Sequence, residues 1–453
     1  MAKYQAYAEY KDSGVEWLGK IPSHWLATQV KYGYLVTLGK MLQSTPKSSL
    51  DELKLYLKAQ NIQPNGINID QVESMWFSPD ECKKLLLQKS DVLVSEGGDA
   101  GRSAIWNCEL EECYIQNAIN RVRPKYVNNS KYFLYWMKFL KSTDFIYIIC
   151  NKATIAHYTA EKLEGSPIFL PSSDEQIAIA NFLDHETAKI DHLIEKQKQL
   201  IELLKEKRQA VISHAVTKGL NPNVKMKDSG MKWLGEVPEH WDVLPIKYLT
   251  ESVNTGGTPK NPISFTDVDE VNWFTPGDFL NDLEITVSSK YVTFDSVNTG
   301  DSKLYPRGSV LMIGIGATLG KIAICNTEFS CNQQINVLVP NRSIISEYLA
   351  YALIIQMDQI KQLSNSSTIG IINQEKTKQI VIALPALDEQ VKIVEKITQK
   401  LLGFKKIIDL AEEQVELLKE RRTALISAAV TGKIDVRHWQ APTVAEADTE
   451  LSA

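Results

Sequence analysis

The chain has 453 residues, with 50 lysines and arginines against 55 aspartates and glutamates, and a formal net charge of −5. This length favours several domains over a single hydrophobic core. The acidic balance argues against a chain that binds nucleic acid over its whole surface, although local basic faces remain compatible with it. Apolar runs are too short to span a membrane, the N-terminus lacks a secretion signal, and the six cysteines form no CxxC pair. We therefore expect a cytoplasmic protein with reduced thiols.

The first segment of the chain returns in its second half. Residues 11–25 (KDSGVEWLGKIPSHW) recur as residues 227–241 (KDSGMKWLGEVPEHW) with 10 of 15 positions identical. We call residues 1–25 and 219–241 the two frame segments. A duplicated frame around divergent inserts indicates two similar units with different surfaces.

The first insert, residues 26–173, reads as a globular domain. Short apolar runs such as DVLVS at 91–95 and RSAIW at 102–106 are separated by Gly, Asn and Pro clusters, and a helical stretch covers residues 131–141. Short strands joined by turns, with interspersed helices, predict an α+β domain.

Residues 174–218 then predict a long amphipathic helix. Apolar residues recur in steps of three and four without an intervening Pro or Gly, which is typical of a heptad seam. Acidic residues at its start and a Gly after its end suit the two termini of a helix. The seam residues expected at a helix-pair interface are Leu183, Ile190, Leu193, Leu200 and Leu204.

The second half repeats this order. After the frame segment 219–241 we expect a second α+β domain over residues 242–386, a second long helix over 387–432, and a partly disordered tail over 433–453. Residues 202–217 recur as 416–431 with 12 of 16 positions identical. The second helix contributes Ile397, Phe404, Ile407 and Leu418 to the interface. Antiparallel pairing of the two helices is the favoured prediction, with a pseudo-two-fold internal repeat, and the alternative is that each helix packs on its own domain.

Convincing catalytic, cofactor and metal patterns are lacking. Gly314, Gly316 and Gly320 follow a strand-like run, as glycines of a dinucleotide-binding loop would. Their spacing is GxGxxxG, however, and neither an acidic residue about 20 positions later nor a βαβ alternation follows. A tight turn is the favoured interpretation. The histidines show no metal-ligand spacing, and His24 and His240 occupy equivalent frame positions where a structural role is expected.

Taken together, the motifs resemble the specificity subunit of Type I restriction-modification enzymes. The motifs are the two DSGxxWLGxxPxHW segments, the LPxxDEQ segments at 170–176 and 384–390, and the LLKE(K/R)R segments at 203–208 and 417–422. The resemblance implies two target-recognition domains, held apart by an antiparallel helix pair, that bind a split, asymmetric DNA sequence. It also implies two docked methyltransferase subunits and, in the restriction form, two motor-nuclease subunits. The chain itself would be non-catalytic and bind no cofactor, with S-adenosylmethionine, ATP and magnesium on its partners.

Comparison of the halves suggests which residues contact DNA. Groups at matched positions can position the phosphate backbone, whereas divergent loops must carry the base readout. The phosphate candidates are Lys47, Arg102, Lys260 and Lys321. The base candidates come from loops rich in amides and hydroxyls, because Asn and Gln suit bidentate contacts with adenine. They are Lys58, Gln60, Asn61, Gln116, Asn117, Asn120, Thr154, His157 and Tyr158 in the first domain, and Asp278, Asn332, Gln333, Gln334, Asn336, Thr368 and Asn373 in the second.

Two other classes of function remain open from the residues alone. One is a self-contained DNA methyltransferase or nuclease, and the other is a coiled-coil structural adaptor. The adaptor explains the long helices but not why the inserts diverged while the frame did not.

Overall fold

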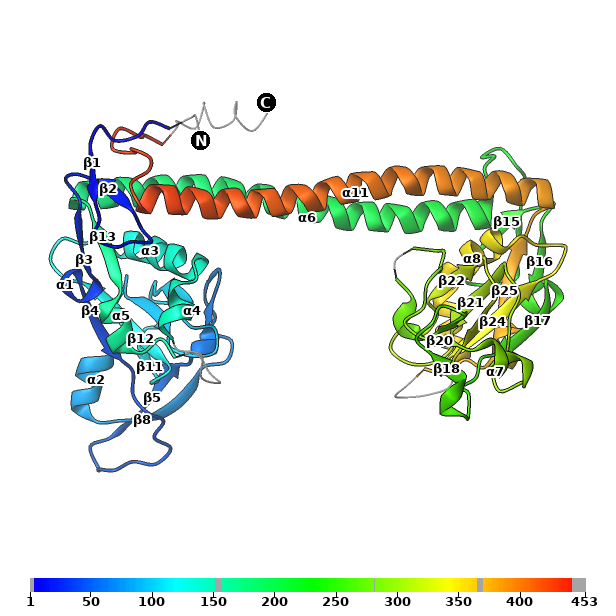
Figure 1. Cartoon of the computed structure of the whole chain (residues 1–453), viewed down its shortest axis with the longest axis horizontal. Coiled ribbons are helices and arrows are strands. Elements are labelled where there is room, and N and C mark those ends of the chain that lie inside the picture. Colours follow the sequence, from blue (N-terminus) through cyan, green and yellow to red (C-terminus); the bar gives the residue numbers. More distant parts are fainter. Residues whose placement is uncertain (1–3, 151–156, 281, 365–369, 442–453) are drawn as a thin grey trace. The chain divides into compact units, whose positions relative to one another are not determined.

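The computed structural model describes residues 4–150, 157–280, 282–364 and 370–441. The chain divides into two compact units, one formed by residues 1–197 with 413–453 and the other by residues 198–412. Each unit contains a globular α+β domain and one part of each long helix, α6 (Ser173–Lys218) and α11 (Leu387–Val430) (Figure 1). The predicted α+β class with two domains joined by long helices is confirmed.

The first domain is built on a four-stranded antiparallel sheet in the order β10-β9-β12-β4. These strands are Ser103–Ile105, Val92–Ser95, Ile119–Pro124 and Tyr34–Leu38. A smaller sheet has the order β11-β5-β8 (Tyr114–Ile115, Glu52–Leu57 and Glu73–Phe77), and β6 (Ile62–Gln63) pairs with β7 (Gly66–Ile67). The helices are α1 (Val30–Gly33), η1 (Ala59–Asn61), α2 (Pro79–Leu85), α3 (Ser130–Ser142), α4 (Phe145–Ile149) and α5 (Ala160–Gly165). Helix α3 buries Tyr132, Phe133 and Trp136 in the main core.

The second domain repeats this topology. Its main sheet has the order β17-β24-β21-β22 (Thr250–Thr255, Ile335–Pro340, Ser309–Ile313 and Ile322–Cys325), and read from its other end, from β22 to β17, this is strand for strand the order of the first domain. The smaller sheet is β18-β20-β19-β23 (Phe265–Thr266, Tyr291–Val292, Val271–Phe274 and Phe329–Cys331). The helices are η2 (Ile246–Tyr248), η3 (Pro262–Ser264), η4 (Pro276–Asp278), α7 (Phe294–Asn298), α8 (Ser346–Ile354), α9 (Met357–Leu363) and α10 (Gln374–Thr377).

In each domain the first and the last strand pair with each other in a two-stranded antiparallel sheet. Strand β3 (Leu26–Gln29) pairs with β13 (Pro167–Leu170), and Leu26 lies opposite Leu170. Strand β16 (Asp242–Pro245) pairs with β25 (Val381–Leu384) in the same way. The frame segments form the hairpins β1-β2 (Tyr10–Asp12, Lys20–Pro22) and β14-β15 (Met226–Asp228, Glu236–Pro238). Each insert therefore leaves and re-enters the frame at neighbouring residues.

The LPxxDEQ motifs fasten the long helices to the domains. The side-chain oxygen of Gln176 accepts a hydrogen bond from the backbone N–H of Asn129 over 2.9 Å, and its amide donates to the carbonyl of Pro171. Gln390 accepts from Ile345 over 3.0 Å and donates to Pro385 in the second domain. These glutamines are fully buried, so the motif fixes where each helix begins.

The two long helices pack antiparallel within each unit. In the first unit, Ile179 near the start of α6 shares a core with Val430 at the end of α11, and Asp191 forms an ion pair of 2.8 Å with Arg422. In the second unit, Ile212 shares a core with Ile393 and Ile397. These cores also include residues of the globular domains. The helices therefore pair antiparallel with each other, as predicted. They also pack on the globular domains, which was the alternative to pairing.

Part of the predicted seam needs correction. Leu183, Ile190, Leu204 and Ile397 are buried, and Phe404 and Leu418 are half-buried. Leu193, Leu200 and Ile407, by contrast, are 44, 39 and 45% exposed. Ile194, Ile201 and Val415 take the inward positions. Steps of three and of four residues both fit a helix of 3.6 residues per turn, so the spacing alone does not decide which of two adjacent apolar residues faces inward.

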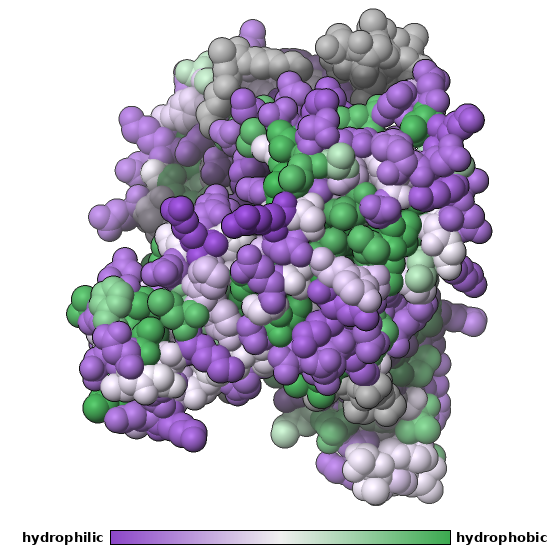
Figure 2. All heavy atoms as spheres, turned by 90° about the vertical axis from the view of Figure 1, so that its right-hand side faces the viewer, coloured by the Kyte–Doolittle hydropathy of each residue, from purple (hydrophilic) through white to green (hydrophobic). Residues whose placement is uncertain are grey.

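The C-terminal tail is ordered where it is described. Its backbone reaches the N-terminal segment through a hydrogen bond from Asp435 to the carbonyl of Gln5, and Trp439 packs edge-on against Phe182. Partial disorder was predicted for residues 433–453, and residues 442–453 of this tail lie outside the described residues. Hydrophilic residues cover much of the face shown in Figure 2, with apolar residues in separate groups between them. Among the described helices, none is both long and apolar enough to cross a membrane.

Candidate nucleic-acid interface

Four loops meet at one end of the main sheet in the first domain. The backbone N–H of Glu96, after β9, donates to the carbonyl of Ala118 in the loop before β12 (2.9 Å). Its carbonyl accepts from Tyr158, before α5 (2.7 Å). The loop after β4 joins them through a bond from the backbone N–H of Lys40 to the carbonyl of Ile115 (3.0 Å). The loops that carry the base candidates Gln116, Asn117, His157 and Tyr158 are thus joined to one another.

The second domain has the same bonds at matched positions. Gly314, after β21, donates to the carbonyl of Gln334 (2.7 Å) and accepts from Ile372 (2.8 Å). Gly257, after β17, donates to the carbonyl of Cys331 (2.8 Å). We call these two sets of loops the recognition loops. Their shared backbone bonding means that the halves differ chiefly in side chains.

A glycine in each domain makes the close approach of these loops possible. A Cβ atom at Gly39 would lie 2.2 Å from the carbonyl oxygen of Gln116, and one at Gly256 would lie 2.1 Å from that of Asn332. Neither distance is compatible with a side chain. These two positions were missed in the sequence, although their place after matched strands is a signal that could have revealed them.

Two amides predicted to read bases instead hold the loops together. Asn120 is fully buried on β12, and its amide donates to the carbonyl of Tyr158 over 3.2 Å. Asn336 is 2% exposed on β24 and donates to the carbonyl of Ile372 over 2.8 Å. The two bonds are equivalent, so these residues belong to the shared frame of the loops and not to the base readout.

Three more candidates are corrected for the same reason. Asn61 is buried and accepts a hydrogen bond from the N–H of Lys58 (2.8 Å), which closes the turn of η1. Asn332 is buried and bonds to Gln334. The ring of Tyr158 is buried, and its hydroxyl lies 2.6 Å from that of Ser166. Because all three use their polar atoms inside the fold, they position neighbouring loops.

The other base candidates keep a position on or near the surface. Gln60, His157, Gln333 and Asn373 are exposed, whereas Lys58, Gln116, Asn117, Gln334 and Asp278 are half-buried. Some are already engaged: Lys58 pairs with Glu73, Asp278 accepts from Thr275 and Ser289, and Asn373 caps α10. Thr154 and Thr368 lie outside the described residues.

Among the cationic candidates, Arg102 and Lys321 share a structural contact. Arg102 Nη2 donates to the carbonyl of Ala59 in η1 (3.1 Å), and Lys321 Nζ donates to the carbonyl of Phe279 just after η4 (3.3 Å). Each side chain therefore ties the turn after a sheet strand to a short helix. This contact uses part of their donor capacity and reduces what remains for phosphate.

Lys47 and Lys260 lie in matched loops and are exposed. The backbone N–H of Lys47 donates to Asp51 (2.8 Å), and that of Lys260 donates to Asp301 (3.0 Å). The bond from Lys47 is the main reason why the pKa of Asp51 is lowered, whereas the hydroxyl of Ser264 is the main reason for the lowered pKa of Asp301. The two carboxylates hold the loops that present these lysines.

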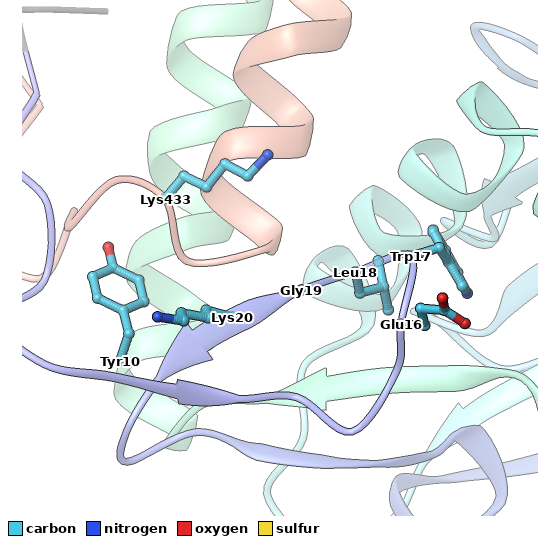
Figure 3. A pocket seen from close by; sticks show the side chains of 7 residues that line it. All are labelled: Tyr10, Glu16, Trp17, Leu18, Gly19, Lys20 and Lys433. Carbon is cyan, nitrogen blue, oxygen red and sulfur yellow. The ribbon is translucent and has the colours of Figure 1, made fainter.

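Outside the recognition loops, an open hollow of about 540 Å³ lies beside the first frame hairpin. Figure 3 shows Tyr10, Lys20 and Lys433 around its opening, with Trp17 and Glu16 at the hairpin turn. This lining has a single carboxylate and no histidine or cysteine. Within the described ranges, no group of three or more His, Cys, Asp or Glu residues could hold a metal ion.

Comparisons with known proteins agree with this arrangement. The profile of the family described as "Type I restriction modification DNA specificity domain" matches residues 38–203 and 238–416. The chain belongs to this family. The two matches cover most of the first domain, the second domain and most of both long helices, and the predicted resemblance to Type I specificity subunits is confirmed.

Individual relatives are distant, and two of the three described here extend along most of the chain. The putative type I restriction enzyme MjaX specificity subunit of Methanocaldococcus jannaschii is 23% identical over 93% of this chain and 96% of its own length. The MjaIX specificity subunit of the same organism is 28% identical over 41% of this chain and 43% of its own length. The StySPI specificity subunit of Salmonella potsdam is 23% identical over 93% of this chain and 92% of its own length.

Solved structures support the fold. A chain from a study of complex assembly in a type I R-M system matches with a TM-score of 0.72 at 15% identity, over 91% of this chain and 99% of its own. The HsdS subunit from Thermoanaerobacter tengcongensis matches with a TM-score of 0.54 at 15% identity, over 91% of this chain and 98% of its own. At such identities the likeness concerns the fold alone.

Proposed function

We propose that this chain is the non-catalytic specificity subunit of a Type I restriction-modification complex and that its two domains read the two parts of a split, asymmetric DNA sequence. One observation carries the proposal. The recognition loops of both domains have the same backbone hydrogen bonds but different side chains, such as Glu96 against Gly314 and His157 against Ile371. A shared scaffold with divergent side chains suits two modules that read different bases.

Assembly with partners is the second part of the proposal. The frame hairpins carry Trp17 and Trp233 at matched positions, 45 and 39% exposed, and large exposed aromatic side chains are enriched at protein interfaces. We assign docking of one methyltransferase subunit to each frame and of two restriction subunits to the full complex. S-adenosylmethionine, ATP and magnesium would then bind to the partners, in the cytoplasm.

Incubation of the purified chain with labelled S-adenosylmethionine, magnesium and DNA tests the absence of catalysis. We expect methyl transfer only after the methyltransferase subunit from the same operon is added, and cleavage only after a restriction subunit is added as well. Methyl transfer or cutting by the chain alone would favour a self-contained enzyme. Failure of the reconstituted complex to bind DNA more tightly than the methyltransferase subunit alone would favour a structural adaptor.

The net charge of −5 predicts how the isolated chain behaves. Its long-range field opposes the approach of DNA, so binding without partners should be weak and strongly dependent on salt. Mobility-shift assays with and without the methyltransferase subunit measure this difference. Tight, sequence-specific binding by the chain alone would show that the partner is unnecessary for recognition.

A further inference from the structure

Glu96 occupies the centre of the recognition loops in the first domain. Its backbone is held between the loop before β12 and the segment before α5, through the bonds to Ala118 and Tyr158. The residue as a whole is half-buried. Its Oε2 atom is buried and accepts no hydrogen bond from the part of the chain that the structure describes. A base cannot reach an atom that is closed to solvent, so contact with DNA falls to the other carboxylate oxygen, which is not among the buried atoms without a partner.

A second acceptor nearby is in the same state. Asn120 Oδ1 is buried without a donor, although its amide is bonded to the carbonyl of Tyr158, the residue whose N–H binds Glu96. In the second domain the equivalent atom, Asn336 Oδ1, accepts from the hydroxyl of Thr255 over 3.0 Å. The first domain has Leu38 opposite Asn120 where the second has Thr255 opposite Asn336.

The matched position explains why Glu96 distinguishes the halves. Gly314 has the same two backbone bonds as Glu96, and a Cβ atom there would lie 2.7 Å from the carbonyl oxygen of Ile372 and 2.8 Å from Asn336 Nδ2. The second domain therefore excludes a side chain at this point, whereas the first places a carboxyl group there. A side chain that is present in the first domain and absent from the matched position of the second can contact only one of the two half-sites.

The turn that carries Glu96 lies beside His157, an exposed candidate for base contact. Burial raises the pKa of its carboxyl above its usual value, and nearby His157 and Lys162 oppose this rise without cancelling it. A Cβ atom at Gly97 would lie 3.6 Å from His157 Nδ1, so the ring of that base candidate lies beside the turn that carries Glu96. Lys162 in turn donates to the carbonyl of His157 (3.0 Å). The carboxyl is thus grouped with a side chain that faces the proposed DNA surface.

We propose that Glu96 is a specificity-determining residue of the first domain, whose carboxylate accepts a hydrogen bond from the exocyclic amino group of a base, cytosine N4 or adenine N6. The inference rests on the proposed function. In the major groove these amino groups are donors, whereas guanine O6 and thymine O4 are acceptors that a carboxylate repels. The same contact therefore selects bases with an amino group and rejects the others.

The test uses the full chain co-expressed with its methyltransferase subunit, followed by sequencing of methylated sites. Glu96→Gln keeps the shape but adds a donor, and Glu96→Ala removes the acceptor. Both should reduce discrimination at one position of one half-site by roughly 10- to 100-fold, and leave the other half-site unchanged. Exposed Glu111→Gln, in the same domain, is the matched control and should retain the wild-type motif.

Oligonucleotides identify the amino group. Pyrimidin-2-one in place of cytosine, or purine in place of adenine, removes the amino group at the affected position. The wild-type complex should then bind the modified DNA more weakly than the unmodified DNA. The Glu96→Ala complex should bind both equally. Unchanged specificity in folded Glu96→Gln and Glu96→Ala complexes would overturn the inference while leaving the proposed function intact. Relaxation of both half-sites together would overturn it as well. A wild-type complex without any sequence preference would instead contradict the proposed function itself.

Discussion

The indole N–H of Trp25 donates a hydrogen bond to Glu175 Oε1 over 2.9 Å, and Trp241 makes the matching bond to Glu389 Oε2 over 3.1 Å. In both units a frame tryptophan is joined to the glutamate of an LPxxDEQ motif about one domain away in sequence. In the first unit Glu175 also accepts from the hydroxyl of Tyr7 (2.6 Å) and contacts His24 (2.9 Å). The bond links the frame, the domain and the long helix at one point.

Replacement of these glutamates should affect the two units unequally. The side chain of Glu175 is 3% exposed and that of Glu389 is 28% exposed. Glu175→Ala leaves buried donors without an acceptor and should cost the first unit about 2–4 kcal/mol, whereas Glu389→Ala should cost the second about 1 kcal/mol. Hydrogen exchange of β1 and the start of α6, compared with β14 and the start of α11, measures each unit separately. Equal effects would contradict the assigned roles.

Adjacent glycines provide a stringent test of the second recognition loops. Gly256→Ala would force a Cβ atom to within 2.1 Å of the carbonyl oxygen of Asn332, so we expect a loss of about 2–3 kcal/mol and failure to recognise one half-site. Gly257→Ala meets nothing within 4 Å and should cost less than about 0.5 kcal/mol. Thermal unfolding and methylation of the reconstituted complex check both. Similar behaviour of the two variants would show that the loops do not approach as described.

The exposed lysines of the matched loops predict a signature in the salt dependence of DNA binding. Lys47→Ala and Lys260→Ala should each weaken binding of the complex without changing its motif. Each should also lower the slope of log affinity against log salt concentration by about 1, because one phosphate contact is lost. Exposed Lys89→Ala is the control. An unchanged slope in either variant would remove that lysine from the phosphate contacts.

Cysteine reactivity reports on the packing of the smaller sheets. Burial raises the pKa of the Cys113 thiol to about 12 and that of Cys331 well above its usual range. At pH 8 about one Cys113 side chain in ten thousand is then ionised, so alkylation should be very slow. Exposed Cys108 should react first. Mass spectrometry of the native protein after brief treatment with iodoacetamide measures the order, and rapid labelling of Cys113 would contradict the buried position.

The fold could be predicted from the sequence because its evidence is local or repeated. Apolar residues spaced three and four positions apart mark both long helices, and the recurrence of DSGxxWLG marks the two frame segments. The register of the helix pair was less accessible. Leu193 and Ile194 are adjacent and both apolar, and steps of three and of four residues both fit a helical turn, so the spacing alone does not determine which of them is buried.

Most of the candidates for DNA contact lie on the loops that meet at the end of each main sheet. Their individual roles remain predictions, and Asn120 shows why a sequence cannot assign them. An amide in a polar loop looks alike whether it faces a base or a carbonyl, and Asn120 meets the carbonyl of Tyr158, 38 residues away. Glu96 was overlooked because its acceptor is isolated only by the tertiary packing.

Exchange of the first domain tests the central claim most directly. Leu26 and Leu170 lie opposite each other in the β3-β13 pair, so residues 26–170 can be replaced by the equivalent insert of a related subunit at two neighbouring points of the frame. The hybrid is expressed with the methyltransferase subunit, and the methylated sites are sequenced. We predict that one half-site changes to that of the donor while the other stays the same. A change in both half-sites, or in neither, for a hybrid that still assembles and methylates would contradict modular recognition by two domains.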